Sequence, residues 1–137
     1  MKKLITAAFA AAVLASCATG VKTGNGGNIN GEWKVVSIDN KKINTDSGLD
    51  APFLGFRGSD LYGSTSCNRL TGAVRIDEKK GTIDFSSTGS TRMMCHDMQT
   101  ETQMLNALGR ATTFKVNGNT LNLCNKDGKT VMELQKK

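Results

Sequence analysis

Apolar and polar residues alternate in short segments along most of the chain after Gly31. Alternation with a period of two is typical of strands that have one packed face and one solvated face. The pattern and its turn signals predict about eight short strands in antiparallel succession. Asn117-Gly118 predicts a type I′ hairpin turn, because both central positions of that turn need positive φ. The expected strands are 31–38, 52–56, 61–66, 73–76, 82–85, 112–116, 120–124 and 130–134.

One segment, 97–111, changes to a helical period. Its apolar positions at helical spacing are Met104, Leu108 and Ala111. Asp97 or Thr100 is expected to cap the helix, and Glu101 suits the helix dipole of the first turn. The economical architecture is α+β and mainly β: a strongly curved antiparallel sheet, or half-barrel, wrapped around the single helix.

The first residues follow a different pattern. A basic start precedes an apolar run at 4–13 and then small residues, which predicts a secretory signal peptide at 1–16. The apolar run is too short for a membrane span, which needs roughly 20 residues. Leu14-Ala15-Ser16-Cys17 resembles the bacterial lipobox, in which the cysteine is acylated and becomes the new N-terminus. The alternative is ordinary signal cleavage near Ala18, with Cys17 lost.

Acyl chains on Cys17 would anchor the protein stably to a membrane. The residue after Cys17 is Ala18 and not Asp, which is compatible with transfer to the outer membrane. We therefore expect an outer-membrane, lipid-anchored protein that faces the periplasm. The segment 17–30 is dense in Gly and Asn and lacks apolar periodicity, which predicts a flexible tether ahead of a domain at 31–137.

The charge of the chain is mildly basic. It falls from +6 to +4 on maturation, because Lys2 and Lys3 leave with the signal peptide and no acidic residue does. The remaining basic residues are scattered, and aromatic residues are only 5% of the chain. A nucleic-acid-binding protein would show a concentrated basic stripe with aromatic residues between the charges. We expect no nucleic-acid partner.

Three cysteines remain besides Cys17, and an exported domain lies where disulfides persist. Cys67 and Cys95 flank the 73–85 hairpin, and closing that loop would stabilise the fold by roughly 3–4 kcal/mol. They are therefore the candidate disulfide. Cys124 is either a buried small apolar residue or the partner of Cys95, and a fully reduced chain is the third possibility.

Catalytic chemistry finds little support in the sequence. Cys95 and His96 are neighbours and point to opposite faces of an extended chain, so they are poorly placed as nucleophile and base. Four potential zinc ligands lack the spacing of zinc sites: Cys67, Cys95, His96 and Cys124. No carboxylate pair, nucleophile elbow or glycine-rich cofactor loop is present. We expect a non-catalytic protein without a cofactor or a metal.

Two motifs carry a family resemblance. Ser66-Cys67-Asn68-Arg69 followed by Thr71-Gly72, together with Thr91-Arg92-Met93-Met94-Cys95, resembles the META domain family. The resemblance implies a small antiparallel β fold around a helix, an envelope location, and a bacterial link to the heat-shock response and novobiocin resistance. No catalytic residue comes with it. The motif residues are expected to build the fold through turns, a cross-link and a buried polar contact: Cys67, Asn68, Gly72, Thr91, Arg92 and Cys95.

The expected function is therefore support of envelope stress or antibiotic tolerance, through binding of a protein or an envelope component. The membrane is a partner through Cys17, and the bound protein or ligand is unknown. One alternative is a thiol-dependent envelope redox enzyme that uses Cys95 or Cys67. The other is a β module that resembles a protease inhibitor or holds a small ligand.

Overall fold

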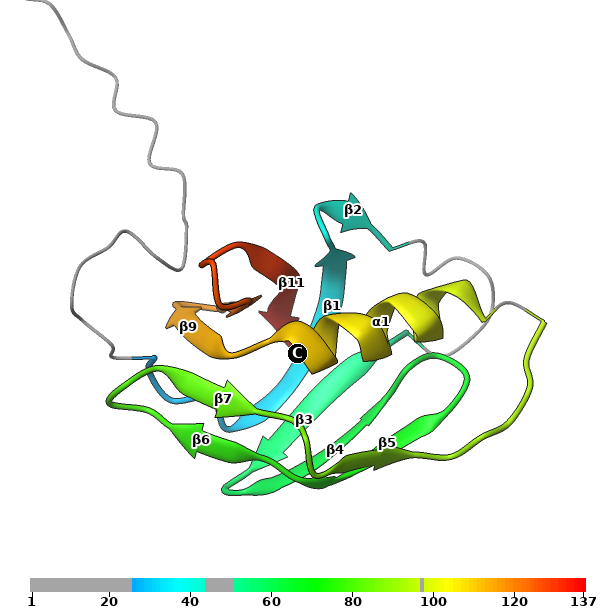
Figure 1. The fold of residues 1–137 in the computed structure, drawn as a ribbon, viewed down its shortest axis with the longest axis horizontal. Helices are drawn as coiled ribbons and strands as arrows, with labels where there is room; N and C mark the ends of the chain where they lie inside the picture. Colours follow the sequence, from blue (N-terminus) through cyan, green and yellow to red (C-terminus); the bar gives the residue numbers. More distant parts are fainter. Residues whose placement is uncertain (1–25, 44–50, 97) are drawn as a thin grey trace, which may run out of the picture.

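A strongly curved antiparallel sheet wraps around the helix α1 (Gln99–Arg110) in the computed structural model (Figure 1). The structure describes residues 26–43, 51–96 and 98–137. The predicted half-barrel is confirmed. Within the described residues, no helix is long and apolar enough to cross a membrane.

Eleven strands make up the sheet, more than the sequence predicted. The three strands that were not predicted, β2, β5 and β8, lie in polar or glycine-bearing segments without clear alternation. They form because they pair with neighbouring strands. The strands are β1 (Gly31–Ile38), β2 (Lys41–Lys42), β3 (Phe53–Arg57), β4 (Asp60–Ser64), β5 (Arg69–Ala73), β6 (Arg75–Asp77), β7 (Thr82–Asp84), β8 (Thr88–Ser90), β9 (Thr113–Asn117), β10 (Thr120–Cys124) and β11 (Thr130–Lys136).

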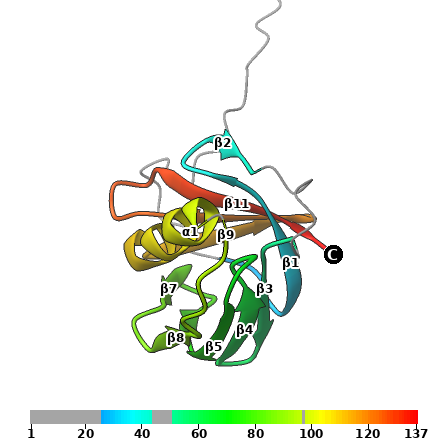
Figure 2. The ribbon, with the colours of Figure 1, turned by 90° about the vertical axis from the view of Figure 1, so that its right-hand side faces the viewer.

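The strand order explains the curvature. It runs β6-β7-β9-β10-β11-β1-β3-β4-β5-β8, with β2 paired to β1. β6 is at one end of this order and β5 is next to the other end, yet only Val74 separates the two strands along the chain. The backbone N–H of Val74 donates to Ser59 O at 2.8 Å, which fixes the bend. The sheet therefore curls around α1, as the view along the helix in Figure 2 makes plain.

Apolar side chains from the concave face of the sheet and from α1 form one core. In β1 the buried Trp33 and Val35 flank the exposed Lys34, as the sequence pattern predicted, whereas in β3 Leu54, Gly55 and Phe56 are all buried. Burial of such side chains contributes about 25 cal/mol for each Å² of apolar surface removed from water. The largest fully buried side chains include Trp33, Phe56, Leu54, Leu70, Met104, Leu121, Leu123, Met132 and Leu134.

The helix start differs from the prediction. Met98 is the N-cap and no side chain caps the helix there. Thr100 lies inside the first turn, so the prediction that it caps the helix is wrong; Asp97 lies outside the described residues. The backbone N–H of Thr102 donates to Met98 O at 3.0 Å, and packing of the inner face then fixes the helix in place of a cap.

The predicted tether at 17–30 is too long at its domain end. Gly26 donates its backbone N–H to Glu78 O and accepts from the N–H of Val116, both at 2.7 Å. Ile29 is only 1% exposed, and its carbonyl accepts the indole N–H of Trp33 at 2.7 Å. The glycines that suggested flexibility instead allow close packing: a Cβ on Gly26 would lie 2.5 Å from the Phe114 ring.

The β9–β10 hairpin is confirmed, but its turn lies one residue later than predicted. Asn117 pairs with Thr120, so the loop residues are Gly118 and Asn119. Gly118 has a φ of 60°, and Asn117 is part of the strand. The two consecutive positive φ values of a type I′ turn occur between β1 and β2, at Asp39 (49°) and Asn40 (64°).

Candidate functional site

The β4–β5 turn presents the Cys67-Asn68 motif. The Thr65 N–H donates to Asn68 O at 2.9 Å, and the Asn68 N–H donates to Thr65 Oγ1 at 2.9 Å. Ser66 between them has a φ of 79°. These reciprocal bonds direct the Asn68 side chain inward, where only 1% of the residue is exposed.

The Asn68 carboxamide joins the two sequence motifs. Its Oδ1 accepts the Thr91 hydroxyl at 2.8 Å and the Met93 backbone N–H at 2.7 Å. Its Nδ2 donates to Met93 O at 3.1 Å and to Glu101 Oε1 at 2.6 Å. All four hydrogen-bonding positions of the amide are thus used, which makes Asn68 the structural centre of the motif.

Sequence reasoning missed the role of Glu101, which was assigned to the helix dipole. The residue is only 4% exposed, and its Oε2 has no hydrogen-bond partner among the described residues. Glu101 occurs at the same helical face as Met104 and Leu108, three and seven residues later. An acidic residue in register with buried apolar positions is the signal that could have identified it.

Thr91 and Gly72 of the motifs help to hold the junction, by which we mean the contact of the Asn68 side chain with Thr91, Met93 and Glu101. Thr91 Oγ1 also accepts the Arg69 backbone N–H at 3.0 Å. Gly72 has a φ of 144°, and a Cβ there would lie 2.5 Å from Ser87 O, so only glycine lets β5 approach this backbone. Arg92 is exposed.

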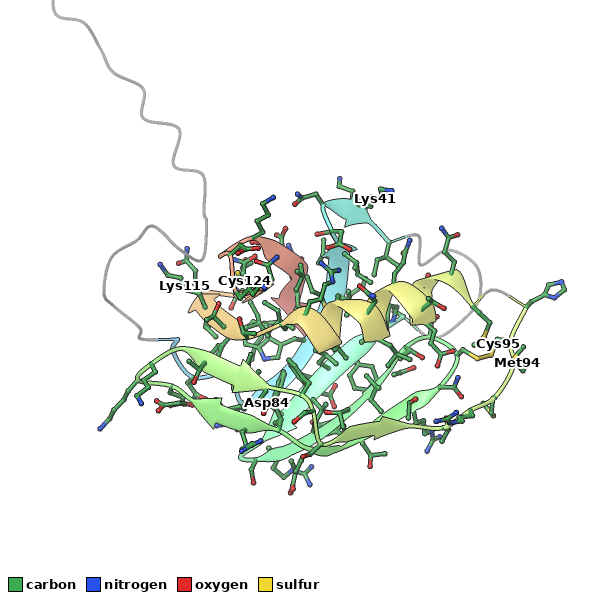
Figure 3. The ribbon with its side chains drawn as sticks, viewed as in Figure 1. Lys41, Asp84, Met94, Cys95, Lys115 and Cys124 are labelled. Atoms are coloured by element: carbon green, nitrogen blue, oxygen red, sulfur yellow. A yellow bond between two sulfur atoms is a disulfide. The ribbon has the colours of Figure 1, made fainter. Side chains whose placement is uncertain are left out.

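Cys67 and Cys95 form a disulfide, with their Cα atoms 5.9 Å apart. It joins the β4–β5 turn to the segment before α1, and Figure 3 shows Cys95 beside the N-terminal end of the helix. The alternative pairing of Cys95 with Cys124 is wrong, as is a fully reduced chain. Cys124 is completely buried, with its sulfur 3.7 Å from Thr130 Oγ1. Cys17 lies outside the described residues.

Among the described residues, Glu101 is the one titratable side chain bonded to Asn68. His96 is exposed on the loop before the helix. The part of the chain that the structure describes contains no group of three or more His, Cys, Asp or Glu side chains placed to hold a metal ion.

The pKa of Asp84 departs from its ordinary value. The backbone N–H of Ser86 donates to its Oδ1 at 2.8 Å, and this bond, more than the Ser86 hydroxyl or the Arg75 guanidinium, lowers the Asp84 pKa below its ordinary value. A lowered pKa in the folded state contributes stability that is present at neutral pH and lost as the pH falls through that pKa. The carboxylate is accessible to solvent, so this contribution is small and structural.

An open groove of about 900 Å³ lies on the outer face of the sheet. Strand register builds its centre: Lys34 of β1 pairs with Phe53 of β3, Phe53 with Ser64 of β4, and Ser64 with Arg69 of β5. We call these four residues the groove row. Both cations at its ends are exposed, whereas Phe53 and Ser64 are partly buried.

A second aromatic residue widens the floor of the groove. Tyr62 packs edge-to-face on Phe53, with ring centroids 6.3 Å apart, and lies over Gly55, which has no Cβ to obstruct it. Tyr62 OH donates to Glu32 Oε1 at 3.3 Å. Lys137 also lies over Phe53, with Nζ 4.4 Å from the ring centroid and 3.2 Å from Glu32 Oε2.

The groove ends at the segment between β8 and α1, which contains Cys95 of the disulfide. Met93, which lines it, is 58% exposed, and the next residue, Met94, is 87% exposed. Figure 3 shows Met94 next to Cys95 at this end of the molecule. Large exposed apolar side chains beside a groove are typical of a contact surface, so the groove is the candidate binding site.

Comparisons with known proteins agree with this architecture. A model of the META domain family matches residues 27–137. A solution structure of a protein from Burkholderia xenovorans is similar, with 21% identity, a TM-score of 0.63, and coverage of 79% of this chain and 82% of that chain. A DUF4847 family protein from Bacteroides vulgatus has 18% identity and a TM-score of 0.59, over 79% of this chain and 93% of that chain.

A further similar solution structure has 21% identity and a TM-score of 0.60, over 77% of this chain and 88% of that chain. At these identities the similarities establish the fold alone. No curated protein matches the chain.

Proposed function

The chain belongs to the META domain family, and from this premise we propose that it is a lipid-anchored envelope protein that acts by binding. Its domain supports tolerance of envelope stress and of novobiocin by holding a protein or an envelope component in the outer-face groove. The observation that carries the proposal is the groove row, which offers two exposed cations on either side of an aromatic floor.

The cysteine chemistry supports binding over catalysis. Cys67 and Cys95 are joined to each other, so neither is a thiolate nucleophile in the oxidised protein. The disulfide also suits an oxidising compartment such as the periplasm. The junction around Asn68 serves to hold the Met93 wall of the groove in place.

Attachment to the membrane makes the first test. We expect the wild-type protein to incorporate labelled palmitate and to fractionate with the outer membrane, because acylated Cys17 anchors it. Cys17→Ser is expected to lose the label and the membrane association. Retention of label in the Cys17→Ser protein, or recovery of the wild type in the soluble periplasmic fraction, would contradict the anchor.

The binding role is tested by complementation. A deletion strain is expected to become more sensitive to novobiocin and to heat, and the wild-type gene to restore tolerance. The double variant Lys34→Ala/Arg69→Ala should fail to restore it, because it removes both cations of the groove row while leaving the core intact. Growth on graded novobiocin is the measurement.

A matched control removes two exposed lysines elsewhere. Lys41 lies on β2 and pairs with Ile38 at the other end of β1 from the groove row, and Lys115 lies on β9, which pairs with no strand of the row. Figure 3 labels both lysines. Lys41→Ala/Lys115→Ala changes the net charge by the same amount and should complement fully. Equal complementation by both double variants, or normal tolerance in the deletion strain, would refute the proposed role of the groove.

A further inference from the structure

The two cations of the groove row have no anionic partner among the described residues. Lys34 and Arg69 form no salt bridge with any described residue, and both are exposed. The nearby carboxylate of Glu32 is already engaged by Lys137 and Tyr62. A ligand that supplies two negative groups would therefore complement the two cations at the ends of the row.

The spacing of the row selects among such ligands. Neighbouring strands lie about 4.8 Å apart, so the backbones of Lys34 and Arg69, three strands apart, are separated by roughly 14 Å. An extended peptide rises roughly 3.3 Å per residue, so residues four apart are roughly 13 Å apart and point to the same side. The residue midway between them also points to that side, toward Phe53.

The lining of the groove favours a peptide over a glycan. Its described lining residues include no Asn, Gln, Asp or Glu, the planar polar side chains that recognise sugar hydroxyls through paired hydrogen bonds. They do include Phe53, Tyr62 and the half-exposed Met93, which suit an apolar side chain. Met is adaptable and is used widely on surfaces that bind varied peptides.

We propose that the groove row binds an extended acidic peptide segment of an envelope protein, with carboxylates at positions i and i+4 and an aromatic or large apolar residue at i+2. The carboxylates lie at Lys34 and Arg69, and the central side chain lies on Phe53 and Tyr62. This inference rests on the proposed binding function and names the class of ligand that the groove takes.

The pattern can be tested with short peptides on the full-length mature protein. The probe is fluorescein-labelled Gly-Asp-Ser-Phe-Ser-Asp-Gly, whose acidic and aromatic side chains share one face when extended. The control, Gly-Ser-Asp-Phe-Asp-Ser-Gly, has the same composition and charge but places both carboxylates on the face opposite Phe. Fluorescence anisotropy is expected to show roughly 10-fold weaker binding of the control. Equal binding of the two peptides overturns the proposal, because charge alone would then suffice.

Protein variants locate the site. Lys34→Ala/Arg69→Ala should weaken binding of the probe by roughly 10-fold, in line with the loss of two exposed ion pairs, and Lys41→Ala/Lys115→Ala should leave it unchanged. Raising the salt from about 0.05 M to about 0.5 M should also weaken binding several-fold. The peptide comparison on the wild type does not depend on whether any variant folds.

Two further outcomes separate this inference from the function on which it rests. If vesicles of phosphatidylglycerol bind through Lys34 and Arg69 while the probe peptide does not bind, the ligand of the groove row is an anionic lipid and the peptide proposal is wrong. If the Lys34→Ala/Arg69→Ala gene fails to restore novobiocin tolerance but neither peptide binds, the groove functions and the ligand class is wrong. If that gene restores tolerance fully, the proposed function itself fails.

Discussion

Asn68→Ala is expected to lower the free energy of unfolding by roughly 3–5 kcal/mol, measured by urea denaturation. The substitution removes a carboxamide that makes four hydrogen bonds at 2.6–3.1 Å with Thr91, Met93 and Glu101. Each bond contributes about 1 kcal/mol net, and the partners left buried without a bond add a further penalty. For a domain of this size the melting temperature should fall by roughly 10–25 °C.

The conservative variant identifies which side of the amide matters. Asn68→Asp keeps the acceptor for Thr91 and the Met93 N–H but replaces the donor that faces Glu101 Oε1 with an oxygen. We therefore expect it to be as destabilising as Asn68→Ala. Wild-type stability in the Asp variant would show that the Nδ2 donations contribute nothing.

An exposed asparagine provides the matched control. Asn106 lies on the solvent side of α1, and the Arg110 Nε donates to its Oδ1 at 2.8 Å. Asn106→Ala should change stability by no more than about 0.5 kcal/mol. A comparable loss in both Asn→Ala variants would argue against a special role for the buried amide.

Loss of the disulfide is the second large effect. Replacing both Cys67 and Cys95 with Ala should lower the free energy of unfolding by roughly 3–4 kcal/mol, because the bond closes a loop between residues 28 positions apart and restricts the unfolded chain. The double variant should keep its fold, since Asn68 still holds Met93 through two hydrogen bonds. Urea denaturation and the circular dichroism spectrum are the measurements.

Combination of the two changes tests how the disulfide acts. If it acts mainly on the unfolded chain, its loss and Asn68→Ala should be additive within about 0.5 kcal/mol, because one changes the unfolded state and the other the folded state. Strong coupling would mean instead that the disulfide positions the Asn68 network. A loss of less than about 1 kcal/mol on removing the disulfide would contradict the entropic account.

The junction and the groove are mechanically connected. The Met93 backbone donates one hydrogen bond to the Asn68 side chain and accepts another from it, and Met93 also forms a wall of the groove. The family motif therefore fixes a surface that faces solvent, although most of its own contacts are internal. This connection explains how a fold-building motif and a binding function can occupy the same part of the chain.

Local patterns in the sequence determined much of the architecture. Alternation defined which face of β1 is packed, and the helical period of Met104 and Leu108 placed α1 correctly to within two residues at its start. These features depend on neighbours within a turn or a strand, so the sequence carries them directly. The sequence pattern did not predict β5, β8 or the ordered structure of residues 26–30. These segments are held by hydrogen bonds to residues that are distant in the sequence.

The sequence by itself determined the family, the half-barrel class and the two motifs that meet at the junction. Only the tertiary structure decided that Asn68 meets Glu101, 33 residues away, and that Lys34, Phe53, Ser64 and Arg69 form one row. Alternation states which face a residue occupies but not which strand lies beside it, and a shift of one residue in register would move every partner. The candidate site is therefore a product of register and curvature, which arise from the whole chain.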